Sequence, residues 1–82
     1  MTQLNEKIRI IRLVLGYSQE NLARDCGISQ RAFSKIERGE TKDIARHLAN
    51  IAHALHVSNA DLKDKPLKEI LGALPEASPG VY

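Results

Sequence analysis

Aromatic residues are scarce in this sequence, which holds two tyrosines, one phenylalanine and no tryptophan among its 82 residues. A chain of this length forms one domain with a modest core, so that core must be mainly aliphatic. Cysteine is also nearly missing, because Cys26 stands alone and cannot form an internal disulfide. This points to a reducing compartment, and we expect Cys26 to be a buried, unreactive thiol.

Long apolar runs are missing as well. The run over residues 10–15 is broken by Arg12 and is too short to span a bilayer. The N-terminus lacks the apolar core and small-residue cleavage site of a signal peptide. We therefore expect a cytoplasmic protein with no membrane partner.

Motifs for catalysis or metal binding are not found. The sequence has no Gly-rich phosphate loop and no motif that pairs a nucleophile with a base or an acid, so we do not expect an enzyme. His47 precedes His53 by six residues, which is about 240° around a helix. No cysteine or carboxylate completes a set with His53 and His56 at metal-ligand spacing. We expect neither a metal nor any other cofactor.

Helical periodicity runs through most of the chain, and no strand-like alternation of apolar and polar residues occurs. A first helix is predicted over about residues 3–15, ending at Gly16, and its apolar face consists of Leu4, Ile8, Ile11 and Leu15. A second apolar set lies elsewhere on this helix and consists of Ile10, Leu13 and Val14. Either this set is extra core or harmless exposure, or it seats another part of the protein.

The middle of the chain is predicted to form two short helices joined by a tight turn. Ser18 and Ser29 are placed as their N-caps, and Gly27 and Gly39 as the residues that end them. Two short helices joined in this way form a helix-turn-helix. The second helix, over about residues 29–37, has an apolar inner face, and its outer side carries Gln30, Arg31, Ser34, Lys35 and Arg38.

Three more helices are predicted toward the C-terminus, over about residues 42–56, 59–64 and 67–74. Thr41 and Asp43 both qualify as N-caps of the first of these. The expected fold class is therefore all-α, a compact bundle of five or six short helices.

The chain divides into three parts by composition. Residues 1–64 form the predicted helix-turn-helix domain, and residues 65–74 a short C-terminal helix for docking or dimerisation. Residues 75–82 contain two prolines and a glycine without periodicity, so we expect a flexible tail.

The net charge of +2 is mild but unevenly distributed. Residues 1–46 hold nine Lys/Arg and six Asp/Glu, whereas residues 47–82 hold three Lys and four Asp/Glu. The basic part contains the predicted helix-turn-helix, which favours an anionic partner there.

Several motifs follow one another along the chain: Gly16-Tyr17-Ser18-Gln19-Glu20, Leu22-Ala23, Gly27-Ile28-Ser29, Ser34-Lys35-Ile36-Glu37-Arg38-Gly39-Glu40 and Ile51-Ala52-x-Ala54-Leu55-x-Val57-Ser58. In this order they resemble the Xre/Cro/cI-type helix-turn-helix family over about residues 4–62. The family includes phage repressors and the controller proteins of restriction–modification systems. The resemblance implies a lambda repressor-like bundle that binds double-stranded operator DNA, usually as a dimer.

The resemblance also implies roles for individual residues. Gln19 would bond a DNA phosphate, and Arg12 and Glu37 would form a structural ion pair. Base edges or nearby phosphates would be contacted by Gln30, Arg31, Ser34 and Lys35. Glutamine can bond adenine, and arginine or lysine guanine, through two hydrogen bonds that give about 1–3 kcal/mol of discrimination. Phosphate contacts set register and affinity, and we assign them to Ser18, Gln19, Arg38, Thr41 and Lys42.

Two apolar stripes lie outside the helix-turn-helix without an assigned partner. The first consists of Ile10, Leu13 and Val14, and the second of Leu67, Ile70, Leu71 and Leu74. A helix as short as the one carrying the second stripe is not stable alone in water. We hypothesise that it packs on the outer side of the first helix, within one chain or across a dimer.

We expect a sequence-specific transcriptional regulator of bacterial or phage origin that associates with the nucleoid when bound. It would be a repressor that binds a partly palindromic operator as a homodimer, with the helix over about residues 29–37 in the major groove. The half-sites would lie about 10 base pairs apart. Two alternatives stay open: an antitoxin-type DNA-binding protein that also holds a protein partner, and a helical adaptor module that does not read DNA.

Overall fold

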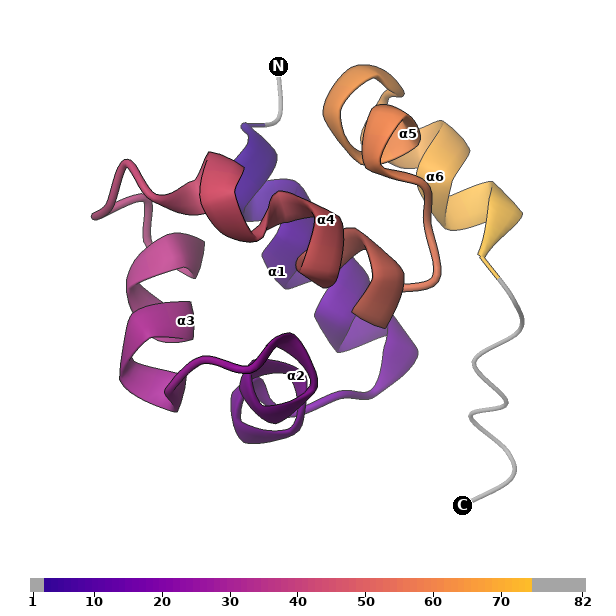
Figure 1. The fold of residues 1–82 in the computed structure, drawn as a ribbon. Helices are drawn as coiled ribbons and strands as arrows, with labels where there is room; N and C mark the ends of the chain where they lie inside the picture. Colours follow the sequence, from indigo (N-terminus) through magenta and orange to yellow (C-terminus); the bar gives the residue numbers. More distant parts are fainter. Residues whose placement is uncertain (1–2, 75–82) are drawn as a thin grey trace.

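The computed structural model describes residues 3–74 and consists of six helices with no strand in that range (Figure 1). The helices are α1 (Leu4–Leu15), α2 (Gln19–Cys26), α3 (Gln30–Glu37), α4 (Ile44–Ala54), α5 (Asn59–Asp64) and α6 (Leu67–Ala73). The expected all-α bundle is confirmed. Residues 75–82, where we expected a flexible tail, lie outside the described residues.

Serine caps begin three of the helices. The hydroxyls of Ser18, Ser29 and Ser58 accept the backbone N–H three residues further on, at 3.0, 3.1 and 3.0 Å. Each bond satisfies an N–H that has no partner inside its helix. Gly27 ends α2 in the left-handed conformation, as predicted.

Helix α4 begins at Ile44 and ends at Ala54, so it is shorter than predicted. Asp43 occupies the N-cap position, but its side chain makes no capping bond. Instead, the hydroxyl of Thr41 accepts the backbone N–H of Asp43 at 3.1 Å, which closes a turn just before the helix. The two N-cap candidates thus lie in one turn that precedes α4, and the helix begins only after this turn.

The core is aliphatic apart from Phe33, which is fully buried, and Cys26. Helices α1 to α5 all contribute to it, with Ile8, Ile11, Leu22, Ile36, Ile51, Leu55 and Leu62 at its centre. Burying one such side chain contributes about 1.5–3 kcal/mol to folding. Since α1 packs against α3 and α4 packs against α2, this core fixes the helix-turn-helix in place.

Lys7 is a buried cation that the sequence analysis missed. Its ammonium donates to the carbonyls of Leu62, Lys63 and Lys65 at 3.4, 3.3 and 2.8 Å. Carbonyls at the end of a helix lack partners within it, and they carry the negative end of the helix dipole. Lys7 therefore joins α1 to the C-terminal end of α5.

The C-terminal helix α6 docks within its own chain. Ile70 is 2% exposed and belongs to the core, and Leu67, Leu71 and Leu74 pack partly buried against that core. Ile70 is therefore buried within its own chain, which is one of the two alternatives left open for this stripe. Docking of α6 does not cover the outer side of α1. Leu13 and Val14 stay 52% and 49% exposed there, whereas Ile10 is half-buried.

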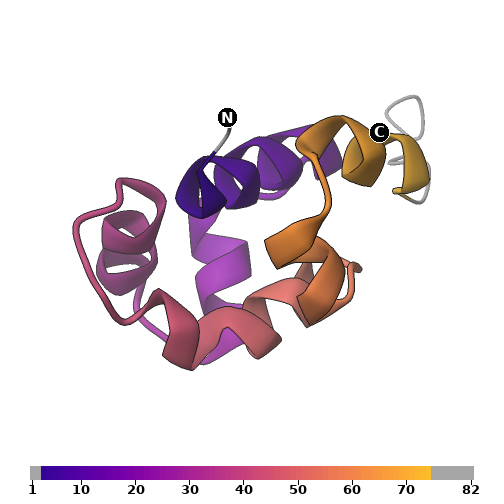
Figure 2. The ribbon, with the colours of Figure 1, turned by 90° about the horizontal axis from the view of Figure 1, so that it is seen from above.

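Helices α3 and α6 lie at opposite sides of the molecule, and a second view at right angles gives the same placement (Figure 2). Docking of α6 therefore leaves the outer face of α3 uncovered. Between residues 3 and 74, no helix is long and apolar enough to cross a membrane.

Candidate nucleic-acid interface

Helix α3 has one buried face and one polar face. Phe33 and Ile36 point into the core with 0% and 2% exposure. Gln30, Arg31 and Lys35 are exposed on the other side, and Ser34 is half-buried among them. The four predicted base-contacting side chains thus lie together on one side of a helix whose other side is packed in the core.

The C-terminal end of α3 is fixed by Glu37. Its carboxylate accepts from Arg12 Nε at 2.6 Å and from Arg12 Nη2 at 3.0 Å. Arg12 Nη1 also donates to the carbonyl of Tyr17 at 2.8 Å, which joins the start of α2 to the same group. The ion pair that the resemblance implies is therefore present, and it connects three helices.

Gln19 takes part in this network as well. Its amide nitrogen donates to Glu37 Oε1 at 2.8 Å. An amide nitrogen carries two N–H groups, so one is used here and the other is left for a ligand such as a phosphate. The predicted phosphate contact of Gln19 thus begins from a side chain already oriented by Glu37.

The hydroxyl of Ser18 is fully engaged within α2. It accepts the backbone N–H of Asn21 at 3.0 Å and donates to Asn21 Oδ1 at 2.6 Å. Its only proton is therefore committed, and a phosphate would have to displace Asn21 to receive it. The predicted phosphate contact of Ser18 stays a prediction, and its side chain would have to exchange Asn21 for the phosphate.

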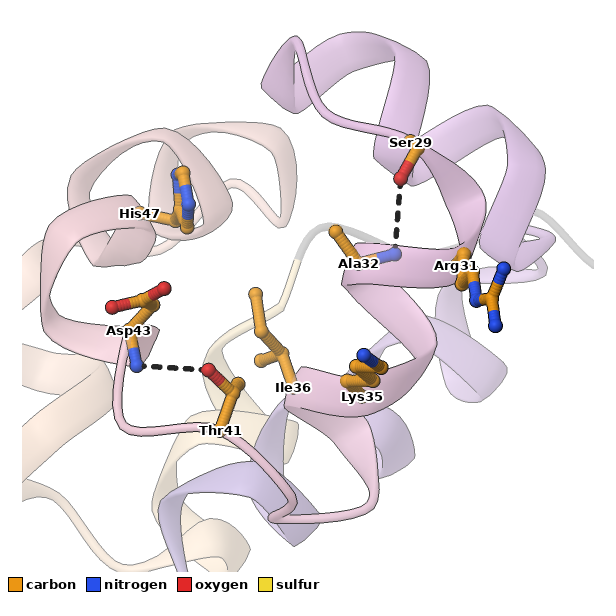
Figure 3. Close-up of a pocket in the computed structure, with 8 residues that line it drawn as sticks. All are labelled: Ser29, Arg31, Ala32, Lys35, Ile36, Thr41, Asp43 and His47. Atoms are coloured by element: carbon orange, nitrogen blue, oxygen red, sulfur yellow. Dashed lines mark hydrogen bonds between the residues drawn. The ribbon is translucent and has the colours of Figure 1, made fainter.

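A cleft of about 330 Å³ separates α3 from the start of α4 (Figure 3). Lys35 and Ile36 lie on its α3 side, and Asp43 and His47 on its α4 side. His47 was not among the predicted contacts, although its spacing of four residues from Asp43 places both on one helical face. The ammonium of Lys35 can attract an anion here and a ring N–H of His47 can donate to one, whereas Asp43 opposes one.

A second hollow, of about 410 Å³, lies on the outer face of α3. It gathers five of the predicted DNA-contacting residues from α2, α3 and the loop that follows: Gln19, Gln30, Arg31, Ser34 and Arg38. Arg38 is already paired there, because its guanidinium bonds Glu40 and the hydroxyl of Ser34. Lys42, in contrast, is an exposed residue of the next loop and lines neither hollow.

Cys26 lies at the end of α2 and is 6% exposed. Burial, and then the negative charge of Asp25, raises the pKa of its thiol. Because the thiolate is the reactive form, this environment suits a packed side chain rather than a reactive one.

Comparisons with known proteins agree with this geometry. A family model described as a helix-turn-helix domain matches residues 3–64. The crystal structure of the hypothetical transcription factor NHTF from Neisseria is similar to this chain with a TM-score of 0.71 and 31% sequence identity, over 83% of this chain and 78% of that one. No curated protein matches. The chain therefore belongs to the helix-turn-helix domain family and is a DNA-binding regulator.

Proposed function

We propose that the protein is a transcriptional repressor that binds a partly palindromic operator as a homodimer. The observation that carries this proposal is the outer face of α3. Gln30, Arg31 and Lys35 are exposed on it, while the opposite face of the helix is buried in the core. An exposed polar face on a rigid helix suits insertion into the major groove, where base edges are read.

The base contacts would come from two turns of α3. Gln30 and Arg31 stand in its first turn, the part that penetrates the groove in helix-turn-helix docking. Ser34 and Lys35 follow one turn later on the same exposed side. Operator sequence would thus be read by two amide or hydroxyl groups and two cations.

The phosphate contacts would surround this helix. Gln19 would use its second N–H, and Arg38 its two N–H groups beyond the three that bond Glu40 and Ser34. Thr41 and Lys42 would hold the backbone next to the cleft, to which we add His47. Such contacts set register and affinity rather than base preference.

The homodimer would use the part of α1 that α6 leaves exposed. Leu13 and Val14 form the candidate surface, with half-buried Ile10 beside them. In this proposal residues 1–64 bind DNA and residues 65–74 complete the core. The same exposed pair favours the second candidate function, an antitoxin-type protein that holds another protein on this surface.

DNA binding by α3 is tested with the paired variant Arg31→Ala/Lys35→Ala. On the sequence that the parent protein prefers, the loss of two specific contacts should weaken binding about 30-fold or more. The slope of affinity against salt should also become shallower, because fewer counterions are released. Fluorescence anisotropy at several salt concentrations measures both quantities.

The matched control is Lys63→Ala/Lys68→Ala, which removes the same charge from exposed positions on α5 and α6. It should weaken binding only slightly, on all sequences alike. Equal losses in the two paired variants would show that α3 does not read DNA. If the parent protein binds no DNA of any sequence, the adaptor alternative is correct.

A further inference from the structure

The guanidinium of Arg38 is held between two side chains just past the end of α3. Its Nε and Nη2 donate to the two carboxylate oxygens of Glu40 at 2.9 and 3.1 Å. Its Nη1 donates to the hydroxyl of Ser34 at 3.0 Å. A chain of bonds therefore runs from Glu40 through Arg38 to Ser34, one of the side chains on the proposed reading face.

The backbone places Glu40 in position to make these bonds. Gly39 adopts φ +72°, its N–H donates to the carbonyl of Ile36 at 3.1 Å, and the N–H of Glu40 donates to that of Lys35 at 2.9 Å. This left-handed glycine turn is a common way to close a helix. The turn thus fixes Glu40 against α3.

The bond from Arg38 limits what Ser34 can do. A serine hydroxyl has one proton to donate and two lone pairs that accept, whereas a guanidinium can only donate. Arg38 therefore occupies a lone pair of Ser34 Oγ and directs its proton elsewhere. Within residues 3–74, the hydroxyl of Ser34 donates to no protein group, so its proton is available to a ligand.

We propose that Glu40, acting through Arg38, fixes Ser34 as a hydrogen-bond donor toward the DNA, and so sets the base preference at one operator position. This inference rests on the proposed function, in which α3 enters the major groove. Glu40 and Arg38 are positioning residues, and Ser34 is the residue that touches the base.

The chemistry of the bases determines which preference follows. In the major groove guanine offers N7 and O6 as acceptors, adenine N7 and thymine O4, but cytosine offers only the donor N4. The proton of Ser34 can bond the first three bases, whereas cytosine can be bonded only through the second lone pair of Oγ, without that proton. Ser34 should therefore discriminate against cytosine on the strand that it faces.

The experiment begins with the operator that the parent protein selects from a random DNA pool. Each base of one half-site is then varied, and the dissociation constant of each DNA is measured by fluorescence anisotropy for the parent protein, Ser34→Ala and Glu40→Ala. In the parent, one position should disfavour cytosine. Loss of one hydrogen bond should weaken this discrimination about two- to tenfold in Ser34→Ala. Glu40→Ala should show the same change at the same position.

The matched control is Glu20→Ala, which also removes one negative charge from an exposed ion pair, that with Arg24 at 3.7 Å. It should raise affinity for all sequences alike and leave the base preference intact. The double variant Ser34→Ala/Glu40→Ala should lose no more discrimination than Ser34→Ala alone, because Glu40 acts only through Ser34. Thermal unfolding of each variant checks that the fold is kept.

Two results would overturn the inference while leaving the proposed function standing. One is a base preference in Glu40→Ala identical to that of Glu20→Ala. The other is a change caused by Glu40→Ala that persists in the Ser34→Ala background. If the parent protein selects no sequence from the pool, the proposed function itself fails.

Discussion

The carboxylate of Glu37 receives three side-chain hydrogen bonds, two from Arg12 on α1 and one from Gln19 on α2. The side chains of the ion pair are only 9% and 2% exposed, so water can solvate neither charge well if the pair is broken. A buried pair of this kind contributes less by its own attraction than it costs to break. Its role is to hold α3 in a fixed orientation relative to α1 and α2.

Replacing Arg12 alone tests this role. In Arg12→Met the carboxylate of Glu37 stays buried without its cation, and the free energy of unfolding should fall by about 3–5 kcal/mol. Urea unfolding followed by circular dichroism measures the change. Arg12→Met/Glu37→Leu, which removes both charges, should recover most of the loss. A single variant as stable as the parent protein would contradict this account.

Lys7 makes a second prediction at the residue scale. Lys7→Met keeps most of the apolar stem but removes the donor that bonds three carbonyls at the end of α5. Carbonyls left without this partner should lower the free energy of unfolding by about 1–3 kcal/mol. Lys63→Met, an exposed position on α5, is the control and should stay within about 0.5 kcal/mol of the parent protein. Equal stability of the two variants would refute the capping role.

At the scale of elements, the two apolar stripes differ in burial, because the stripe of α6 docks on the core whereas that of α1 stays partly exposed. Helix α6 is short, yet Ile70 reaches the core, whereas Leu13 and Val14 on the longer α1 remain about half exposed. Apolar side chains left on a surface are candidates for contact with another molecule. The stripe on α1 is therefore the one that bears on assembly.

Two alanine variants separate stability from assembly. Ile70→Ala leaves a cavity in the core and should lower the free energy of unfolding by about 2–5 kcal/mol. Leu13→Ala removes an exposed side chain, so it should leave the stability of the monomer nearly unchanged while shifting any dimer toward monomer. Chemical unfolding and light scattering over a range of concentrations measure these effects. If Leu13→Ala alters neither dimerisation nor partner binding, the proposed surface is wrong.

At the scale of the whole molecule, the sequence was sufficient for the fold class and for most helix boundaries. Residues such as Ser18, Ser29 and Gly27 act through near neighbours, so their roles are visible in local spacing. The grouping of polar residues on α3 followed from helical periodicity in the same way. The ion pair of Arg12 with Glu37 came from the family resemblance, not from spacing.

Features that depend on distant contacts were not visible. Lys7 meets carbonyls more than fifty residues away, and no pattern in the sequence relates them. The bond of Gln19 to Glu37 likewise depends on how α2 and α3 pack. The commitment of the Ser18 hydroxyl to Asn21 is local, but it depends on a side-chain rotamer that sequence does not specify.

The central claim is that the outer face of α3 reads a partly palindromic operator, one subunit per half-site. Selection of bound sequences from a random DNA pool by the full chain tests it most directly. The account predicts two inverted copies of one short sequence, with centres about 10 base pairs apart. A pool that shows no enrichment, or a single site without inverted symmetry, would contradict it.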